Sequence, residues 1–542
     1  MMYGEFFDLK EIDVAQSLLN DGLTRAGQLM AGQAPWTIQT GPVTRGDISK
    51  IDGSVQPYGL VIPESFTTGA MRWRLDFWFH GRGEQLSEVK FLNQRRQDKG
   101  QFTPPQTIVL HPYGRYCNAN KLGGEIDTLE AIQSIPRRYV IDEDRTAVRG
   151  FSMGGAACWQ FAVHYTDHWA AAAPGAGFSE TPGFLTFYQK EILEPTWYEK
   201  KLWRMYDCTD YAVNLAQLPI VAYSGDRDVQ KQAADAMAVA MKKEGIDLVH
   251  IIGPETGYSY HAAAKAEIDR RIDSILSVGR NRMPQEIRFT TPTLRYNQMH
   301  WLTVDGLSDH WTPARVEAKI LHIPNDHPAI RLSVRNVTAL TLSFPPGLSP
   351  INPTSNIQVM VTDGEQQTLV AAPRVGSDRS WLCPLSRGAD GKWKMGAAPT
   401  GGPVKKHGSQ GPIDDAFLDS FVFVKPSGNA AHQRIENWAT TELEHAVKHW
   451  RQQFREHARV TLDTEIGEDE IAQHNLILFG DTSSNTVLKK IIDKLPIAWT
   501  QTEIVAGTRR FEADKHALIA IDPNPRNPRK YVVLNSGFTF RE

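Results

Sequence analysis

The residues best suited to chemistry are Gly-Phe-Ser-Met-Gly-Gly at 150–155. An apolar stretch at 146–149 predicts a buried strand before them, and small apolar residues at helical spacing follow over 156–163. A serine between glycines at a strand-to-helix junction is typical of a nucleophile elbow, because only small neighbours fit so sharp a turn. The helix that begins there offers backbone N–H groups, that of Met153 among them, to a developing oxyanion. This stretch therefore predicts nucleophilic attack by Ser152 on an acyl carbon.

A nucleophilic serine needs a base, and an acid that orients the base. The apolar stretch 219–223 predicts a buried strand that ends in two candidate acids, Asp226 and Asp228. The next predicted strand, 248–252, is followed by a loop that presents His261 just before a predicted helix. Serine, acid and histidine thus each follow a strand, which predicts that they meet at one edge of a sheet.

A second oxyanion donor is expected upstream. The aromatic-rich stretch 73–79 predicts a strand, and it leads directly into His-Gly-Arg-Gly at 80–83. Glycine lets the backbone approach a substrate oxygen without a side chain in the way. We expect a backbone N–H at or near Arg82 to complete the oxyanion hole, and the His80 side chain to contact substrate.

Three further side chains are candidates for substrate binding. Arg115 follows the predicted strand 107–112, where it either lines the pocket or braces its own loop by pairing with Glu125 or Asp127. Phe178 follows the strand that comes after the elbow helix. Trp197 belongs to an aromatic-rich insertion over 184–211, which is either a lid or a packing helix.

Together these motifs resemble the α/β-hydrolase superfamily over roughly residues 40 to 280. The branch they most resemble holds prolyl oligopeptidase-like catalytic domains and the related bacterial feruloyl and acetyl esterases. In that branch the acid occupies the last position of Gly-x-x-Asp. The resemblance therefore implies a triad of Ser152, His261 and Asp228, an oxyanion hole from the backbone of Met153 and Arg82, and no metal or organic cofactor.

The chain departs from prolyl oligopeptidases in two ways. No propeller precedes the hydrolase segment, and His-Gly-Arg-Gly stands where those enzymes carry a Tyr-Gly-Gly-type loop. Both departures favour carboxylic esters, small or oligomeric, as substrates over short peptides. The prediction is an esterase that works through an acyl-enzyme. The alternatives are a prolyl oligopeptidase-like peptidase and, in another class, a non-catalytic binding protein on a hydrolase scaffold.

The remaining chain predicts further parts around an α/β-hydrolase domain at 41–283. Residues 1–40 predict a helical segment with an apolar packing stripe at Leu18, Leu19, Leu23, Ala26 and Leu29. Short alternating strands predict a β-sandwich-like domain at 284–389. A Gly/Pro/Lys-rich linker at 390–412 and a small Rossmann-like or flavodoxin-like α/β domain at 413–542 follow.

Bulk composition excludes several classes of protein. The 542 residues are 41% hydrophobic and 22% charged with a net charge of −3, so nothing predicts a nucleic-acid-binding surface. No stretch has the length of a membrane span, and no membrane partner is expected. Four scattered cysteines form no C-x-x-C pair. The first twenty residues do not have the pattern of a signal peptide, which predicts a cytoplasmic protein or a mature secreted or periplasmic chain whose leader has been removed.

Overall fold

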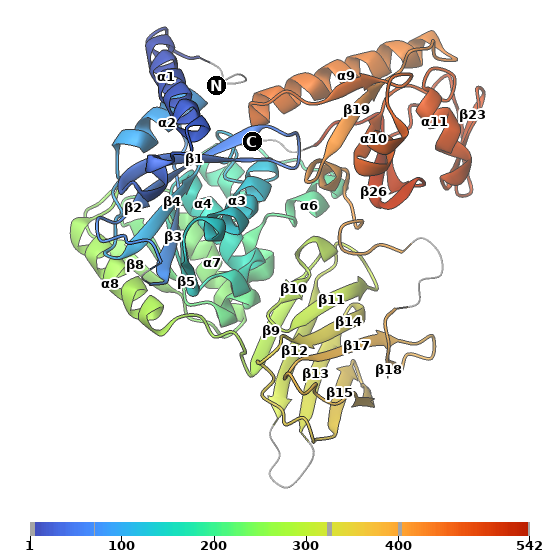
Figure 1. The fold of residues 1–542 in the computed structure, drawn as a ribbon. Coiled ribbons are helices and arrows are strands. Elements are labelled where there is room, and N and C mark those ends of the chain that lie inside the picture. Colours follow the sequence, from blue (N-terminus) through green and yellow to red (C-terminus); the bar gives the residue numbers. More distant parts are fainter. Residues whose placement is uncertain (1–5, 70, 322–327, 399–403, 540–542) are drawn as a thin grey trace.

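The computed structural model describes residues 6–69, 71–321, 328–398 and 404–539. The first half of the chain is built on an eight-stranded sheet, which Figure 1 shows with helices packed around it. The strand order is β1-β2-β4-β3-β5-β6-β7-β8. The strands are β1 (Gly41–Ile48), β2 (Val55–Ile62), β3 (Trp73–Phe79), β4 (Thr107–Pro112), β5 (Ile141–Phe151), β6 (Ala171–Gly175), β7 (Val221–Gly225) and β8 (Val249–Gly253). From β4 to β8 all neighbours run parallel, whereas β1 and β2 pair antiparallel at one edge.

Helices cover both faces of this sheet. Successive strand residues point to opposite faces, and β5 shows the result: Val148 joins the core under α4, whereas Ala147 joins the core under α8. The helices packed on the sheet are α2 (Glu88–Gln97), α3 (Gly123–Ser134), α4 (Met153–His164), α7 (Lys231–Lys243) and α8 (Ala262–Val278). Alternation with parallel strands places the carboxyl ends of β3 to β8 along one edge, where the candidate residues lie.

The N-terminal segment contains one long helix, α1 (Glu11–Met30), which packs against α2. The predicted packing stripe is wrong for most of its members. Leu19, Leu23 and Leu29 are exposed, with Leu23 at 70%. The residues that α1 does bury are Glu11 and Ala15, at its first two turns. The periodic pattern identified the helix correctly but not the face that packs.

Residues 286–395 form two five-stranded sheets around a shared core, with orders β10-β11-β14-β17-β18 and β16-β15-β13-β12-β9. In β12 buried positions alternate with less buried ones, as in a sheet with one face in a core. The strands are β9 (Glu286–Thr291), β10 (Gln298–Met299), β11 (Leu302–Leu307), β12 (Ala314–Leu321), β13 (Ala329–Arg335), β14 (Val337–Phe344), β15 (Ile357–Asp363), β16 (Gln366–Ala372), β17 (Trp381–Arg387) and β18 (Trp393–Met395). Since β18 lies within 390–412, that segment is not purely a linker; residues 399–403 within it lie outside the described part.

The last part of the chain is a five-stranded sheet with helices, in the order β20-β19-β21-β26-β25. Its first three neighbouring pairs are parallel and the β25–β26 pair is antiparallel. The strands are β19 (Phe421–Lys425), β20 (Val460–Leu462), β21 (Asn475–Leu478), β25 (Ala520–Asn524) and β26 (Asn527–Leu534), with α9 (Gln433–Phe454), α10 (Glu468–Gln473) and α11 (Thr486–Ile491). A three-stranded hairpin sheet adds β22 (Ile497–Trp499), β23 (Glu503–Ala506) and β24 (Arg509–Glu512).

This C-terminal part packs against the loop that follows β4. Trp450 and Phe454 of α9 share one hydrophobic core with Leu122 and Ile126. The Asn118 amide donates to the carbonyl of Gln453 at 3.4 Å. Helix α9 therefore holds a loop at the same edge of the sheet as the candidate site.

Candidate active site

Ser152 lies on a tight turn between β5 and α4. Strand β5 ends at Phe151, α4 begins at Met153, and the backbone of Ser152 has φ 64° and ψ −127°. A positive φ is rare for a residue other than glycine and marks a strained turn. A Cβ on Gly154 would lie 2.0 Å from the carbonyl oxygen of Phe79, so only glycine fits there. The predicted strand–turn–helix is confirmed, and its turn leaves Ser152 partly exposed.

The His-Gly-Arg-Gly loop lies directly beside this serine. A Cβ on Gly81 would be 3.9 Å from Ser152 Oγ. The His80 ring lies between two carbonyl oxygens, those of Gly81 and Tyr113, each 2.8 Å from one ring nitrogen. Burial lowers the pKa of His80. Both ring nitrogens of His80 thus face backbone carbonyls, and one of them donates its N–H, so the ring braces this loop; its contact with substrate stays a prediction. Arg82 is half-exposed, and its guanidinium lies 3.3 Å from Glu84.

The two candidate acids behave differently. Asp226 accepts hydrogen bonds from the N–H groups of Glu255 (2.9 Å) and Thr256 (3.0 Å), and these bonds lower its pKa. Asp228 is buried, and its Oδ1 accepts from the N–H of Gln230 at 2.8 Å. The other oxygen, Oδ2, is buried without a hydrogen-bond partner among the described residues, and burial raises the pKa of the carboxyl. Asp228 is thus the acid with a carboxylate oxygen left for another group.

His261 stands immediately before α8, in the loop that follows β8. Its backbone N–H donates to the Tyr223 hydroxyl at 2.7 Å. Its Nδ1 is buried and, like Asp228 Oδ2, has no hydrogen-bond partner in the described part of the chain. Two complementary unpaired atoms therefore follow the neighbouring parallel strands β7 and β8.

Tyr258 was not among the residues expected from the sequence. Its hydroxyl donates to Ser152 Oγ, and its ring packs against Phe151 with centroids 5.2 Å apart. Burial raises the pKa of this phenol. In this conformation Ser152 is hydrogen-bonded to a tyrosine of the loop that carries His261. The only sequence signal was the Tyr-Ser-Tyr run at 258–260, directly before the histidine.

Of the three expected substrate-binding side chains, two lie away from a pocket. Arg115 is fully buried, paired with Asp127 (2.6 Å) and Asp52 (2.5 Å), so it braces its loop and does not line the site. Trp197 lies on α6 (Trp197–Trp203) and is 72% exposed.

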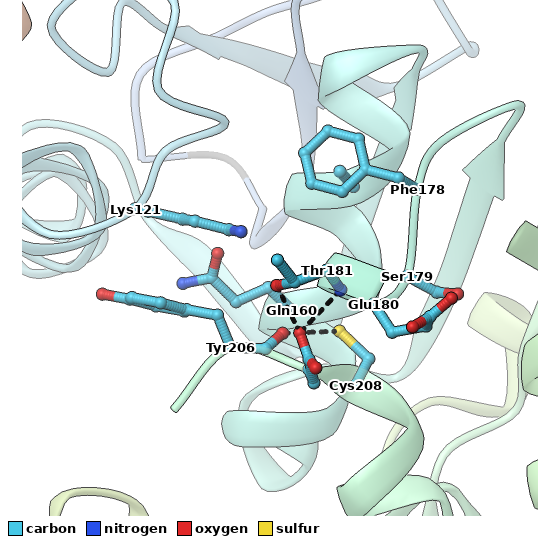
Figure 2. Close-up of a pocket in the computed structure, with 10 residues that line it drawn as sticks. Lys121, Gln160, Phe178, Ser179, Glu180, Thr181, Tyr206 and Cys208 are labelled. Carbon is cyan, nitrogen blue, oxygen red and sulfur yellow. Dashed lines mark hydrogen bonds between the residues drawn. The ribbon is translucent and has the colours of Figure 1, made fainter. Parts of the chain in front are cut away.

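Phe178 does line a small pocket, shown in Figure 2. The pocket runs beside α4, whose Ala156 and Gln160 form part of it, and Lys121 enters from the loop after β4. Asp207 also lines the pocket. Its carboxylate accepts hydrogen bonds from the Thr181 N–H (2.8 Å) and the Thr181 hydroxyl (2.6 Å), and burial raises the pKa of Asp207 to about 7. Neither Lys121 nor Gln160 was singled out from the sequence.

No group of three or more metal-ligating side chains occurs within the described ranges. No helix in those ranges is both long and apolar enough to cross a bilayer.

A mostly parallel eight-stranded sheet with a nucleophile elbow after β5, and an acid and a histidine after β7 and β8, defines an α/β-hydrolase fold. Residues 118–274 match the prolyl oligopeptidase family. This segment contains Ser152, Asp228 and His261. This segment is accordingly of the serine-hydrolase type that includes peptidases and esterases.

Similar solved structures come from both kinds of hydrolase. A ferulic acid esterase is 18% identical with a TM-score of 0.34, covering 45% of this chain and 100% of the esterase. A putative dipeptidyl aminopeptidase IV from Bacteroides ovatus is 12% identical with a TM-score of 0.34, covering 44% of this chain and 35% of the aminopeptidase. An acylaminoacyl peptidase in complex with Z-Gly-Gly-Phe-chloromethyl ketone is 15% identical with a TM-score of 0.34, covering 43% and 44%. This chain thus covers well under two thirds of either peptidase. No curated protein matches the chain.

Proposed function

We propose that the protein hydrolyses carboxylic esters through an acyl-enzyme on Ser152. His261 acts as general base and then general acid, and Asp228 orients it. The observation that carries the proposal is the pair of buried, unpaired atoms, Asp228 Oδ2 and His261 Nδ1, on the loops after β7 and β8, in the same sheet as the elbow serine. A buried polar atom without a partner costs about 1–3 kcal/mol, so pairing these two relieves both penalties at once. That pairing is the acid–histidine contact of a serine hydrolase.

The proposed reaction has an acylation step and a deacylation step. His261 Nε2 accepts the Ser152 proton as Oγ bonds to the acyl carbon, and the carbonyl oxygen becomes an oxyanion. Backbone N–H groups of Met153 and Arg82 stabilise that charge, each by about 3 kcal/mol. The protonated His261 gives its proton to the leaving alcohol, and a water molecule repeats the sequence to release the acid. Tyr258 must first give up its hydrogen bond to Ser152 Oγ.

Ester cleavage is favoured over amide cleavage by the chemistry of the leaving group. An alkoxide leaves far more readily than the anion of an amine, so an ester makes a smaller demand on proton donation to the leaving group. A peptidase acting on short peptides is the second candidate, and the match of residues 118–274 to the prolyl oligopeptidase family favours it.

The test compares four substrates side by side: p-nitrophenyl acetate, p-nitrophenyl butyrate, methyl ferulate and a proline-containing peptide anilide. We expect wild-type protein to turn over esters in preference to the anilide, and Ser152→Ala to lose at least a thousandfold in rate while it unfolds at the same temperature. A fluorophosphonate probe should label the wild type but not the variant. Anilide cleavage that matches ester cleavage would favour the peptidase, and near-wild-type turnover by Ser152→Ala would refute Ser152 as nucleophile.

A further inference from the structure

The loop that carries the proposed oxyanion donor Arg82 is held by the loop that follows β4. The Gly83 N–H donates to Cys117 Sγ at 3.4 Å, and the Tyr116 hydroxyl donates to the carbonyl oxygen of Glu84. Both contacts are made to backbone atoms directly after Arg82. The direction of the Arg82 N–H therefore depends on where the loop after β4 lies.

The backbone of that second loop is unusual at the point of contact. Tyr116 has φ 91°, and the preceding Arg115 has φ 57°. A bulky side chain rarely adopts a positive φ, and such a backbone persists only where surrounding contacts hold it. Arg115 has its ion pairs with Asp52 and Asp127. The position of Tyr116 depends in addition on what packs against its ring.

The C-terminal part of the chain contacts the Tyr116 ring. In Figure 1 helix α9 extends from the C-terminal part to the hydrolase part, and it ends at Phe454. The next residue, Arg455, places its guanidinium carbon 3.7 Å from the centroid of the Tyr116 ring. Phe7 stacks on the same ring, with centroids 6.4 Å apart. A guanidinium so close to a ring centroid makes a cation–π contact.

The end of α9 is well packed, so Arg455 approaches Tyr116 from a fixed position. Trp450 and Phe454 are fully buried in the core that α9 shares with the hydrolase part. Arg455 has φ 59° where it ends the helix, and its N–H donates to the Arg451 carbonyl oxygen at 3.0 Å. Side chains supported by packed elements hold a more precise geometry than side chains on loops.

We propose that Arg455 is a positioning residue for the reaction at Ser152. It holds the Tyr116 ring, the Tyr116 hydroxyl holds the Glu84 carbonyl, and the Arg82 N–H is thereby kept in place for the oxyanion. This inference rests on the proposed function, because it concerns the charge that forms when Ser152 attacks an ester. It gives the C-terminal part a role in catalysis that is exerted through the oxyanion loop.

Kinetics with p-nitrophenyl butyrate test the proposal. An oxyanion donor acts on the transition state, so its displacement lowers kcat and leaves KM unchanged. We expect Arg455→Met to lose roughly tenfold in kcat, since a misplacement of about 1 Å can cost about a hundredfold. A trifluoromethyl ketone, which forms an oxyanion on the serine, should inhibit this variant about tenfold more weakly. Arg455→Lys keeps a cation over the ring and should keep most of the activity.

A double variant separates positioning from a general loss of stability. Tyr116→Phe keeps the ring but loses the hydroxyl contact to Glu84, so it should also lose roughly tenfold in kcat. Because both residues act through one contact, Arg455→Met combined with Tyr116→Phe should lose about tenfold and not a hundredfold. Arg434→Met is the matched control, since Arg434 is exposed at the other end of α9 and should leave kcat unchanged.

Amide hydrogen exchange tests the same contact without turnover. Residues 80–88 should exchange roughly tenfold faster in Arg455→Met than in the wild type. Unchanged exchange there, an unchanged kcat in Arg455→Met, a rise in KM alone, additive losses in the double variant, or an equal loss in Arg434→Met would overturn the proposal. The proposed function fails separately, through absence of fluorophosphonate labelling and ester turnover in the wild type. Faster exchange in that case would leave the hold of Arg455 on the loop standing and refute only the proposed function.

Discussion

Replacing Tyr258 by phenylalanine tests how Ser152 is held in this conformation. The Tyr258 hydroxyl donates to Ser152 Oγ, in competition with the contact to His261 that the proposed mechanism requires. A hydrogen bond between neutral groups contributes about 0.5–1.5 kcal/mol, which corresponds to a factor of about two to ten in an equilibrium. Removing it should make Ser152 two- to tenfold more available. We therefore expect Tyr258→Phe to react about two- to tenfold faster with a fluorophosphonate probe under pseudo-first-order conditions.

Tyr260→Phe is the control for this experiment. Tyr260 also packs on Phe151, with centroids 4.9 Å apart, but no hydrogen bond of its hydroxyl occurs within the described ranges. It should label at the wild-type rate. A hundredfold loss of labelling in Tyr258→Phe would refute the reasoning, because it would show that the Tyr258 hydroxyl stabilises the transition state and not the resting serine.

Three further changes test the packing and electrostatics around the site. Gly154→Ala places a methyl group 2.0 Å from the Phe79 carbonyl oxygen. It should lower the free energy of unfolding in urea by at least about 1–3 kcal/mol and abolish labelling by the fluorophosphonate probe. Normal labelling would contradict the elbow geometry. Arg115→Leu leaves two buried carboxyl groups unpaired and should cost about 3–5 kcal/mol in the same assay, whereas a loss below about 1 kcal/mol would contradict the pairing. Burial raises the pKa of Asp207 from 3.8 to about 7, so the folded state keeps a proton that the unfolded chain loses, and stability falls as pH rises from 3.8 to 7. Asp207→Asn removes that penalty and should raise the melting temperature more at pH 8 than at pH 4; equal gains would contradict the shift.

The features that the sequence could predict are local in the chain. Glycine spacing around Ser152, an apolar strand before it and small residues after it are all readable within 20 residues, and the structure confirms that strand, turn and helix. The strands before Asp228 and His261 are similarly short apolar runs, and both are present as β7 and β8. These elements depend mainly on periodicity and turn sterics, which a single segment contains.

The features that sequence reasoning missed depend on partners far away in the chain. Arg115 pairs with Asp52, which lies 63 positions earlier, and no local sequence pattern predicts that pairing. Tyr258 reaches Ser152 across 106 positions, because the ends of β5 and β8 meet at one edge of the sheet. The apolar stripe of α1 shows that a correctly predicted helix can still expose the face that was expected to pack. Periodicity fixed a helix there, but whether a face is covered depends on what packs against it.

The pocket beside α4 depends on parts of the chain that come after the hydrolase fold. Glu125 Oε2, which fixes the Gln160 amide, also accepts from Tyr206 and from Tyr296, each at 3.0 Å. Tyr296 lies between β9 and β10, and the adjacent Arg295 pairs with Asp415 of the C-terminal part at 3.5 Å. Hydrogen bonds in a buried polar network rigidify the side chains that they join. The middle and C-terminal parts therefore supply hydrogen bonds and charge around Glu125, and Glu125 in turn sets the direction of the Gln160 side chain. On this reasoning a truncated chain ending near residue 283 would keep the elbow but lose the fixed orientation of Gln160.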